Sequence, residues 1–206
     1  MKNPKILNEI AEYLVGSNLS LSARFADGRI NATMNEDEVI KLIKKKFDVE
    51  VPKSRHWFDF SIEHNGEFYP VNIKITDTTH ADNLNCKLGI YYSLTGKFPD
   101  FPNETSWLDY FQRLKDNLKE TKNNYYFLVI NKSDNKDIFV NSLKSLSILQ
   151  PNGNNLPFQC KWEINKKPKN RNYKESKDLI LKTFGESIKL RADIYFIFKR
   201  LFKEYV

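Results

Sequence analysis

The sequence is poor in cysteine and has no long apolar run. Only Cys86 and Cys160 occur among 206 residues, and their spacing fits neither a disulfide scaffold nor a metal site, so we expect free thiols. Nothing approaches the ~20 apolar residues of a membrane span; the longest apolar run in the last third is 194–198. Residues 1–14 are amphipathic and lack the apolar core of a signal peptide. These absences predict a cytoplasmic protein with no membrane partner.

The composition is that of a folded protein with an excess of positive charge. Hydrophobic residues make up 40%, aromatic residues 14% and charged residues 29%, which excludes intrinsic disorder and a coiled coil as the main state. Lysine and arginine number 33 against 26 acidic residues, giving a net charge of +7. This charge suits a polyanionic partner without requiring one. The length predicts a single domain over residues 1–206.

Apolar periodicity and turn residues predict the order of the secondary structure elements. Asn35 has the character of an N-cap, and three acidic residues follow it in the first turn of a predicted helix. The pattern as a whole predicts an α/β (α+β) fold with one central mixed β-sheet flanked by helices. The predicted helices cover residues 4–15, 36–47, 82–95, 105–120 and most of 175–206, and the predicted strands 56–63, 67–76, 125–130 and 137–140.

The dipeptide Asn65-Gly66 sets the register of the predicted hairpin. Asn-Gly favours a two-residue type I′ turn, so His64 should lie opposite Glu67 and, further along, Asp59 opposite Asn72. Because side chains alternate between faces, Asp59, Asn72 and Lys74 then share one face, with opposed Cβ atoms about 5 Å apart. A β-bulge would change this register.

These three residue types together are suited to metal-assisted chemistry. A carboxylate is a hard oxygen ligand for Mg²⁺, and an amide oxygen is a weaker, neutral one. A lysine beside them can stabilise negative charge that develops on a phosphate. The alternative is an ordinary cross-strand ion pair between Asp59 and Lys74 on the protein surface.

The spacing of these residues resembles the PD-(D/E)XK nuclease core. Asp59 is followed, after twelve residues, by Asn72-Ile73-Lys74, and the segments 58–60 and 71–76 are similar to those of EcoRV-like type II restriction endonucleases. The resemblance covers about residues 36–95. Phe58 stands where the motif has proline, and Asn72 stands where it usually has Asp or Glu. The second departure removes a formal charge from the metal site.

The resemblance implies a Mg²⁺ cofactor within a catalytic core at about residues 36–140. It also implies an acid from the preceding helix. Glu36 shares a helical stripe with apolar residues and is preferred to Glu38, although either could simply complement the helix dipole. The implied catalytic residues are Asp59, Asn72, Lys74 and Glu36, and the implied metal ligands are Asp59, Asn72, the Ile73 carbonyl and Glu36.

Residues 141–206 are expected to contain the DNA-recognition part and the C-terminal helix. The segment 150–160 is rich in amides, which can bond adenine in the major groove, and it resembles the recognition loop of EcoRV-like enzymes. A plain turn and a solvated basic loop are the alternatives for this part. The predicted DNA contacts are Asn152, Asn154, Asn155, Gln159, Thr78 and Thr79, with Lys166, Lys167, Lys169 and Arg171 for phosphates.

The sequence therefore predicts a type II site-specific deoxyribonuclease. The resemblance implies Mg²⁺-dependent hydrolysis of double-stranded DNA at a short, palindromic site, leaving a 5′-phosphate. A palindromic site suits a homodimer, and a restriction enzyme requires a cognate DNA methyltransferase in the same system. The alternatives are a repair or recombination nuclease on the same core, and a non-catalytic nucleic-acid-binding protein.

Overall fold

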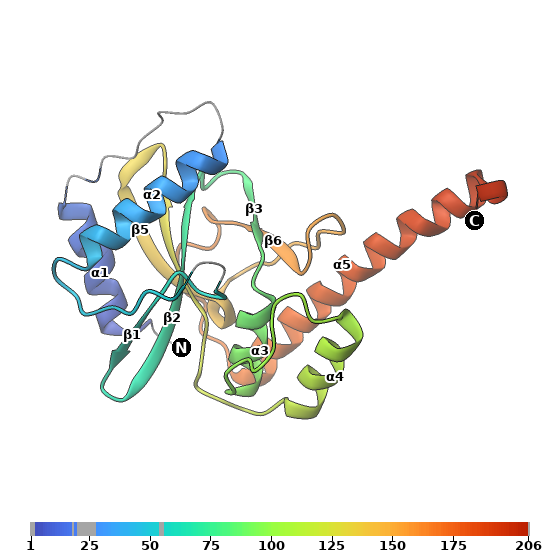
Figure 1. The fold of residues 1–206 in the computed structure, drawn as a ribbon, viewed down its shortest axis with the longest axis horizontal. Helices are drawn as coiled ribbons and strands as arrows, with labels where there is room; N and C mark the ends of the chain where they lie inside the picture. Colours follow the sequence, from blue (N-terminus) through green and yellow to red (C-terminus); the bar gives the residue numbers. More distant parts are fainter. Residues whose placement is uncertain (1–2, 18, 20–27, 54–55, 206) are drawn as a thin grey trace.

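The computed structural model describes residues 3–17, 19, 28–53 and 56–205 (Figure 1). Its helices are α1 (Lys5–Gly16), α2 (Gly28–Ile43), α3 (Lys87–Thr95), α4 (Trp107–Asn117) and α5 (Tyr173–Leu201), with short 3₁₀ turns η1 (Leu143–Ser145) and η2 (Lys203–Tyr205). Its strands are β1 (Phe60–His64), β2 (Glu67–Thr76), β3 (Ala81–Leu84), β4 (Tyr126–Asn131), β5 (Asp134–Ser142) and β6 (Phe158–Lys161).

The central sheet is mixed, as predicted. Its strand order is β1-β2-β4-β5; the two hairpins are antiparallel, and β2 and β4 pair in parallel at the centre. Helices α3 and α4 lie in the connection between the two parallel strands. Strands β3 and β6 form a separate antiparallel pair. The protein is thus α+β, with a mixed central sheet flanked by helices.

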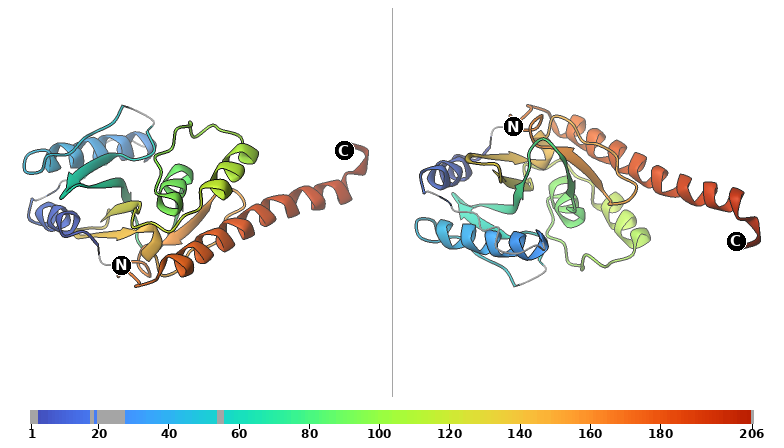
Figure 2. Two further views of the ribbon diagram at one scale, coloured as in Figure 1. Left: turned by 90° about the horizontal axis from the view of Figure 1, so that it is seen from below. Right: turned by 90° about the horizontal axis from the view of Figure 1, so that it is seen from above.

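Apolar side chains cover both faces of the sheet. Strand β4 supplies Tyr126, Leu128 and Ile130 to the face covered by α1 and α2, and Phe127 and Val129 to the face covered by α3, α4 and α5 (Figure 2). Because successive strand residues point to opposite faces, a strand buried on both sides is a continuous apolar run. This explains why β4 is among the clearest strands in the sequence.

Several predicted boundaries are wrong; strand β1, for example, begins at Phe60 and not at residue 56. Helix α2 begins at Gly28, so Asn35 lies inside the helix and does not cap it. The predicted helix over 82–95 is divided: 81–84 form strand β3, and α3 starts at Lys87. Asp82 and Asn83 lack apolar periodicity of their own, and β3 exists because it pairs with β6, about 80 residues later in the chain.

The structure also gives the state of the two cysteines and the character of the helices. Both cysteines are free, as expected, and both are buried. Across the described ranges, none of the helices combines the length and the apolar composition that a bilayer crossing requires.

Candidate functional site

The hairpin turn has the geometry that Asn65-Gly66 predicts. Both residues have positive φ, 53° and 73°, as a type I′ turn requires. His64 pairs with Glu67, and the register continues without a bulge to Phe60 opposite Val71. The turn therefore determines which residues meet at the far end of the hairpin.

At that far end, the carboxylate of Asp59 lies against β2. The Asp59 backbone N–H donates to the Val71 carbonyl at 2.9 Å. Val71 is already the partner of Phe60, so the one-to-one register ends at Phe60 and Asp59 lies just before β1. Asp59 Oδ2 accepts from Asn72 Nδ2 at 2.7 Å and from the Ile73 N–H at 2.6 Å. Since the N–H and C=O of a strand residue point to the same edge, the Ile73 carbonyl also faces this end of the hairpin.

Lys74 shares the face of Asn72, and its ammonium reaches toward β3. Lys74 Nζ donates to the Asn83 carbonyl at 2.9 Å and lies 3.7 Å from Asp82 Oδ1. The Trp162 indole donates to Asp82 Oδ2 at 2.7 Å and fixes that carboxylate. The lysine is therefore held near Asp59, and its first partners are on β3.

Glu36 brings a second carboxyl group to the same place. Burial and the negative charge of Asp59 raise its pKa to about 7, while the ammonium of Lys74 acts in the opposite direction. Burial likewise raises the pKa of Asp59, against the opposing effects of the Ile73 N–H and Lys74. The structure thus places Glu36, Asp59 and Lys74 within electrostatic reach of one another, as the helical stripe of Glu36 suggested.

Two carboxyl groups that resist ionisation fit a hard divalent cation. A cation would offset the burial that raises both pKa values, and also the negative charge of Asp59 that further raises the pKa of Glu36. Among the described residues, no three His, Cys, Asp or Glu side chains gather as a metal-ligand group. Mg²⁺ would therefore be held by Glu36 and Asp59 together with neutral oxygens. The Ile73 carbonyl is a candidate for such an oxygen, whereas Asn72 turns its side-chain nitrogen toward Asp59.

A cavity of about 570 Å³ opens beside Asn72. Its lining combines aromatic and amide side chains, including Trp57, Asn85, Phe101 and Asn103. Of the candidate metal ligands, Asn72 lines this cavity.

Tyr125 hydrogen-bonds the chain just before the hairpin. Its hydroxyl donates to the Trp57 carbonyl at 2.6 Å, two residues before Asp59. A side chain at Gly89 would place its Cβ 2.7 Å from the Tyr125 ring. Glycine at this position therefore allows the ring, and with it the hairpin, to keep its place.

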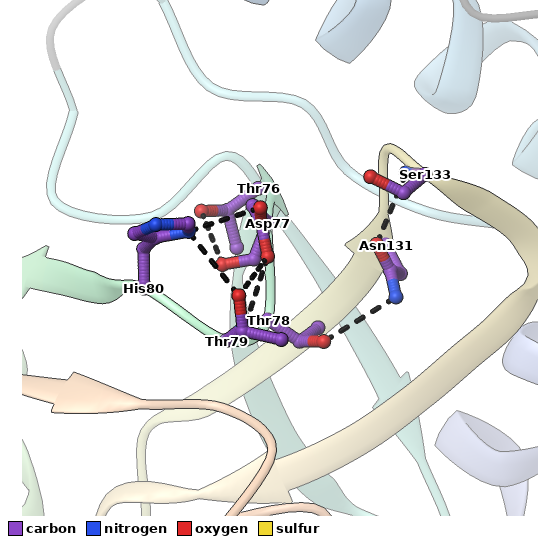
Figure 3. Close-up of polar contacts among 7 residues, drawn as sticks. All are labelled: Thr76, Asp77, Thr78, Thr79, His80, Asn131 and Ser133. Carbon is purple, nitrogen blue, oxygen red and sulfur yellow. Dashed lines mark hydrogen bonds and ion pairs between the residues drawn. The ribbon is translucent and has the colours of Figure 1, made fainter.

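The loop after β2 is organised by Asp77 (Figure 3). Its carboxylate accepts from the Thr79 backbone at 2.9 Å and from the Thr79 hydroxyl at 2.7 Å, and lies 3.0 Å from His80 Nδ1. These bonds, those of Thr79 first, lower the pKa of Asp77 to about 2. Thr78 is buried and its hydroxyl accepts from Asn131 Nδ2. Of the two threonines predicted to contact DNA, Thr79 is thus the exposed one.

The segment 150–157, here named the amide loop, is held together by Asn152. The side-chain nitrogen of Asn152 donates to Asn83 Oδ1 at 2.8 Å and to Gln159 Oε1 at 2.9 Å. Its side-chain oxygen accepts from the backbone N–H groups of Asn154 and Asn155 at 3.0 and 3.1 Å. Asn152 and Gln159 are therefore engaged inside the protein, while Asn154 and Asn155 are exposed.

The four predicted phosphate contacts are also divided. Lys166 pairs with Asp137 at 2.7 Å, and the Arg171 guanidinium donates to the carbonyls of Leu146 and Ser147. Lys167 and Lys169 are exposed. The exposed pair is better placed for phosphate than the other two.

Asp82 and Asn83 are the site residues that sequence reasoning missed. They were assigned to a helix start, and no local signal indicates a strand of four residues. Only their pairing with β6 turns them toward Lys74 and the amide loop.

Comparisons with protein-family models and with curated proteins find no match to this chain.

Proposed function

We propose that this protein is a Mg²⁺-dependent nuclease of the PD-(D/E)XK type that cleaves double-stranded DNA at a short, palindromic site, as type II restriction endonucleases do. The convergence of Glu36, Asp59 and Lys74 around one hairpin end carries this proposal. A plain cross-strand ion pair between Asp59 and Lys74 explains it less well, because the ammonium of Lys74 lies at the Asn83 carbonyl and near Asp82, both on β3.

The residues have separable tasks in such a reaction. When bound, Mg²⁺ supplies positive charge that polarises a phosphodiester and makes a neighbouring water more acidic. Asp59 and Glu36 hold the cation, and Asn72 orients Asp59 through its 2.7 Å hydrogen bond. Lys74 stabilises the charge that develops on the phosphate. Glu36, with a pKa of about 7, can hold or release a proton near neutral pH.

The proposal extends to specificity and partners. Exposed Asn154 and Asn155 are the candidates for contacts with base edges, and Lys167 and Lys169 those for phosphates. Two-fold symmetric DNA calls for two copies of the chain. A cytoplasmic location and a cognate methyltransferase complete the proposal.

Incubation of the purified protein with phage DNA tests the proposal. Discrete fragments in Mg²⁺ that disappear in EDTA are the expected result. A smear or structure-specific nicking would instead favour a repair nuclease, and a gel shift without cleavage a binding protein.

Matched variants assign the activity to this site. Asp59→Asn keeps an acceptor for the Ile73 N–H but removes the charge, and we expect cleavage to fall by at least about 10²-fold. Glu63→Gln alters an exposed acid on the same hairpin and should leave cleavage unchanged. Equal activity of the two variants would refute the assignment of the metal site.

A further inference from the structure

The two halves of α5 have different surroundings. In the first half, Ile180 and Phe184 are buried against the rest of the protein. From residue 189 onward every residue of the helix is exposed, and the ribbon extends away from the body (Figures 1 and 2). The projecting half is nevertheless strongly apolar.

The exposed apolar surface of the projecting half is large. Nine large apolar side chains between Leu190 and Tyr205 are at least 44% exposed. At roughly 100 Å² for each half-exposed side chain, they present on the order of 900 Å². The largest apolar patch of a typical monomer is about 300–600 Å², and a standard interface takes about 800 Å² from each partner. The total therefore exceeds the largest patch of a typical monomer, but the nine side chains lie on several sides of the helix, so a single partner would cover only part of it.

Four of these side chains have coiled-coil spacing. Leu190, Ile194, Ile197 and Leu201, here named the α5 seam, are separated by four, three and four residues. This alternation places them along one side of a helix and is the repeat by which two helices pack together. Phe196, by contrast, falls near the opposite side at 100° per residue.

The charges beside the seam are self-complementary in an antiparallel pair. In that arrangement Leu190 of one copy meets Leu201 of the other, and Ile194 meets Ile197. Asp193 of each copy then flanks Arg200 of the other, so two-fold symmetry forms this ion pair twice.

A parallel pair fits the flanking charges less well. It would set Asp193 beside Phe198. The other basic residue near the seam, Arg191, already donates to the carbonyls of Gly153 and Asn154 at 2.7 and 2.9 Å.

We propose that the α5 seam is the dimer interface of this protein and that it pairs with the α5 seam of a second copy in antiparallel orientation. The proposal rests on the helix alone and holds whether or not the chain cleaves DNA. It also identifies which surface would join the two copies that a palindromic site requires.

Neighbouring substitutions test the seam. Light scattering of the full chain should give about twice the 24.3 kDa of one copy. Ile197→Asp should weaken the dimer by roughly tenfold or more, whereas Phe196→Asp should leave it dimeric. Circular dichroism checks that both variants keep their helix content. A monomeric wild type, or equal effects of the two variants, would overturn the proposal.

Charge reversal tests the pairing of the flanking residues. The single variant Asp193→Arg places two positive charges beside each other at both symmetric positions, because the new arginine of each copy flanks Arg200 of the other. It should weaken the dimer several-fold. Adding Arg200→Asp restores both pairs and should restore the dimer. Failure of the double variant to recover would contradict the proposed pairing.

Disulfide trapping tests the orientation. The native cysteines are buried and do not interfere. Mixed Leu190→Cys and Leu201→Cys chains should form a disulfide with each other under mild oxidation, and neither variant with itself. Homodisulfides would show a parallel pair and overturn the proposed orientation. Binding of monomers to anionic phospholipid vesicles through the seam would show a membrane surface instead.

Discussion

Short sequence motifs predict functional roles for both the hairpin end and the amide loop, yet the polar side chains of the two regions have different partners. In the hairpin, the side chains of Asp59 and Lys74 lie in one cluster with Glu36. In the amide loop, the side chain of the central Asn152 makes four hydrogen bonds within the protein. A strand pleat determines where a side chain points, whereas a loop side chain often bonds the backbone groups that the loop leaves without partners.

The largest expected effect tests whether the residues at the hairpin end take part in DNA cleavage. Lys74→Ala should lower DNA cleavage by about 10²–10³-fold, because it removes the positively charged ammonium group beside the proposed metal site. Specific DNA binding, measured by gel shift, should remain. Lys115→Ala, at an exposed position on α4 with no proposed role in binding DNA, is the matched control. Unfolding of the Lys74 variant would show that the lysine is a structural partner of β3.

A second, smaller effect tests whether Asn152 is structural. Asn152→Ala leaves Asn83, Gln159 and two backbone N–H groups without their partner, and should lower the free energy of unfolding by about 1–3 kcal/mol. Asn154→Ala should change it by no more than about 0.5 kcal/mol, and should instead reduce discrimination between DNA sequences. Urea unfolding separates the two. Equal losses of stability would remove the distinction between the two residues.

The smallest expected effect is the part of the pH dependence of folding stability that comes from Glu36 at the hairpin end. An ordinary glutamate has a pKa of 4.5, while Glu36 in the fold has one of about 7. Between these values the native state binds more protons than the unfolded state, so stability falls as pH rises. In metal-free buffer the urea midpoint should be higher at about pH 5 than at about pH 8 as far as Glu36 contributes, and Glu36→Gln should reduce that difference. If Glu36→Gln left the difference between the two urea midpoints unchanged, the side chain of Glu36 would be solvated and not buried beside Asp59.

Much of the sheet could be predicted because its signals are local. The Asn65-Gly66 turn determined the hairpin register, and the apolar run of β4 indicated a strand buried on both faces. The predicted meeting of Asp59 and Asn72 is present as a side-chain hydrogen bond, although the paired register itself ends at Phe60 opposite Val71.

The remainder depends on partners distant in sequence. Strand β3 is defined by β6, and the hydrogen bond from Lys74 to Asn83 follows from that pairing. The helical stripe suggested Glu36 but could not reveal that burial and Asp59 hold its pKa near 7. Nor could the amide content of residues 150–160 distinguish Asn152, bonded inside, from Asn154 and Asn155, exposed outside.

Asn83 joins two parts of the molecule that have separate tasks in the proposed function. Its carbonyl accepts from Lys74 at 2.9 Å, and its side-chain oxygen accepts from Asn152, which in turn shapes the backbone of the amide loop. If an incorrect base sequence displaced the amide loop, Asn83 would move with it, and Asn83 is also the residue that positions Lys74. Reading and cutting would then share one mechanical link, and fidelity would be enforced at the chemical step as well as in binding.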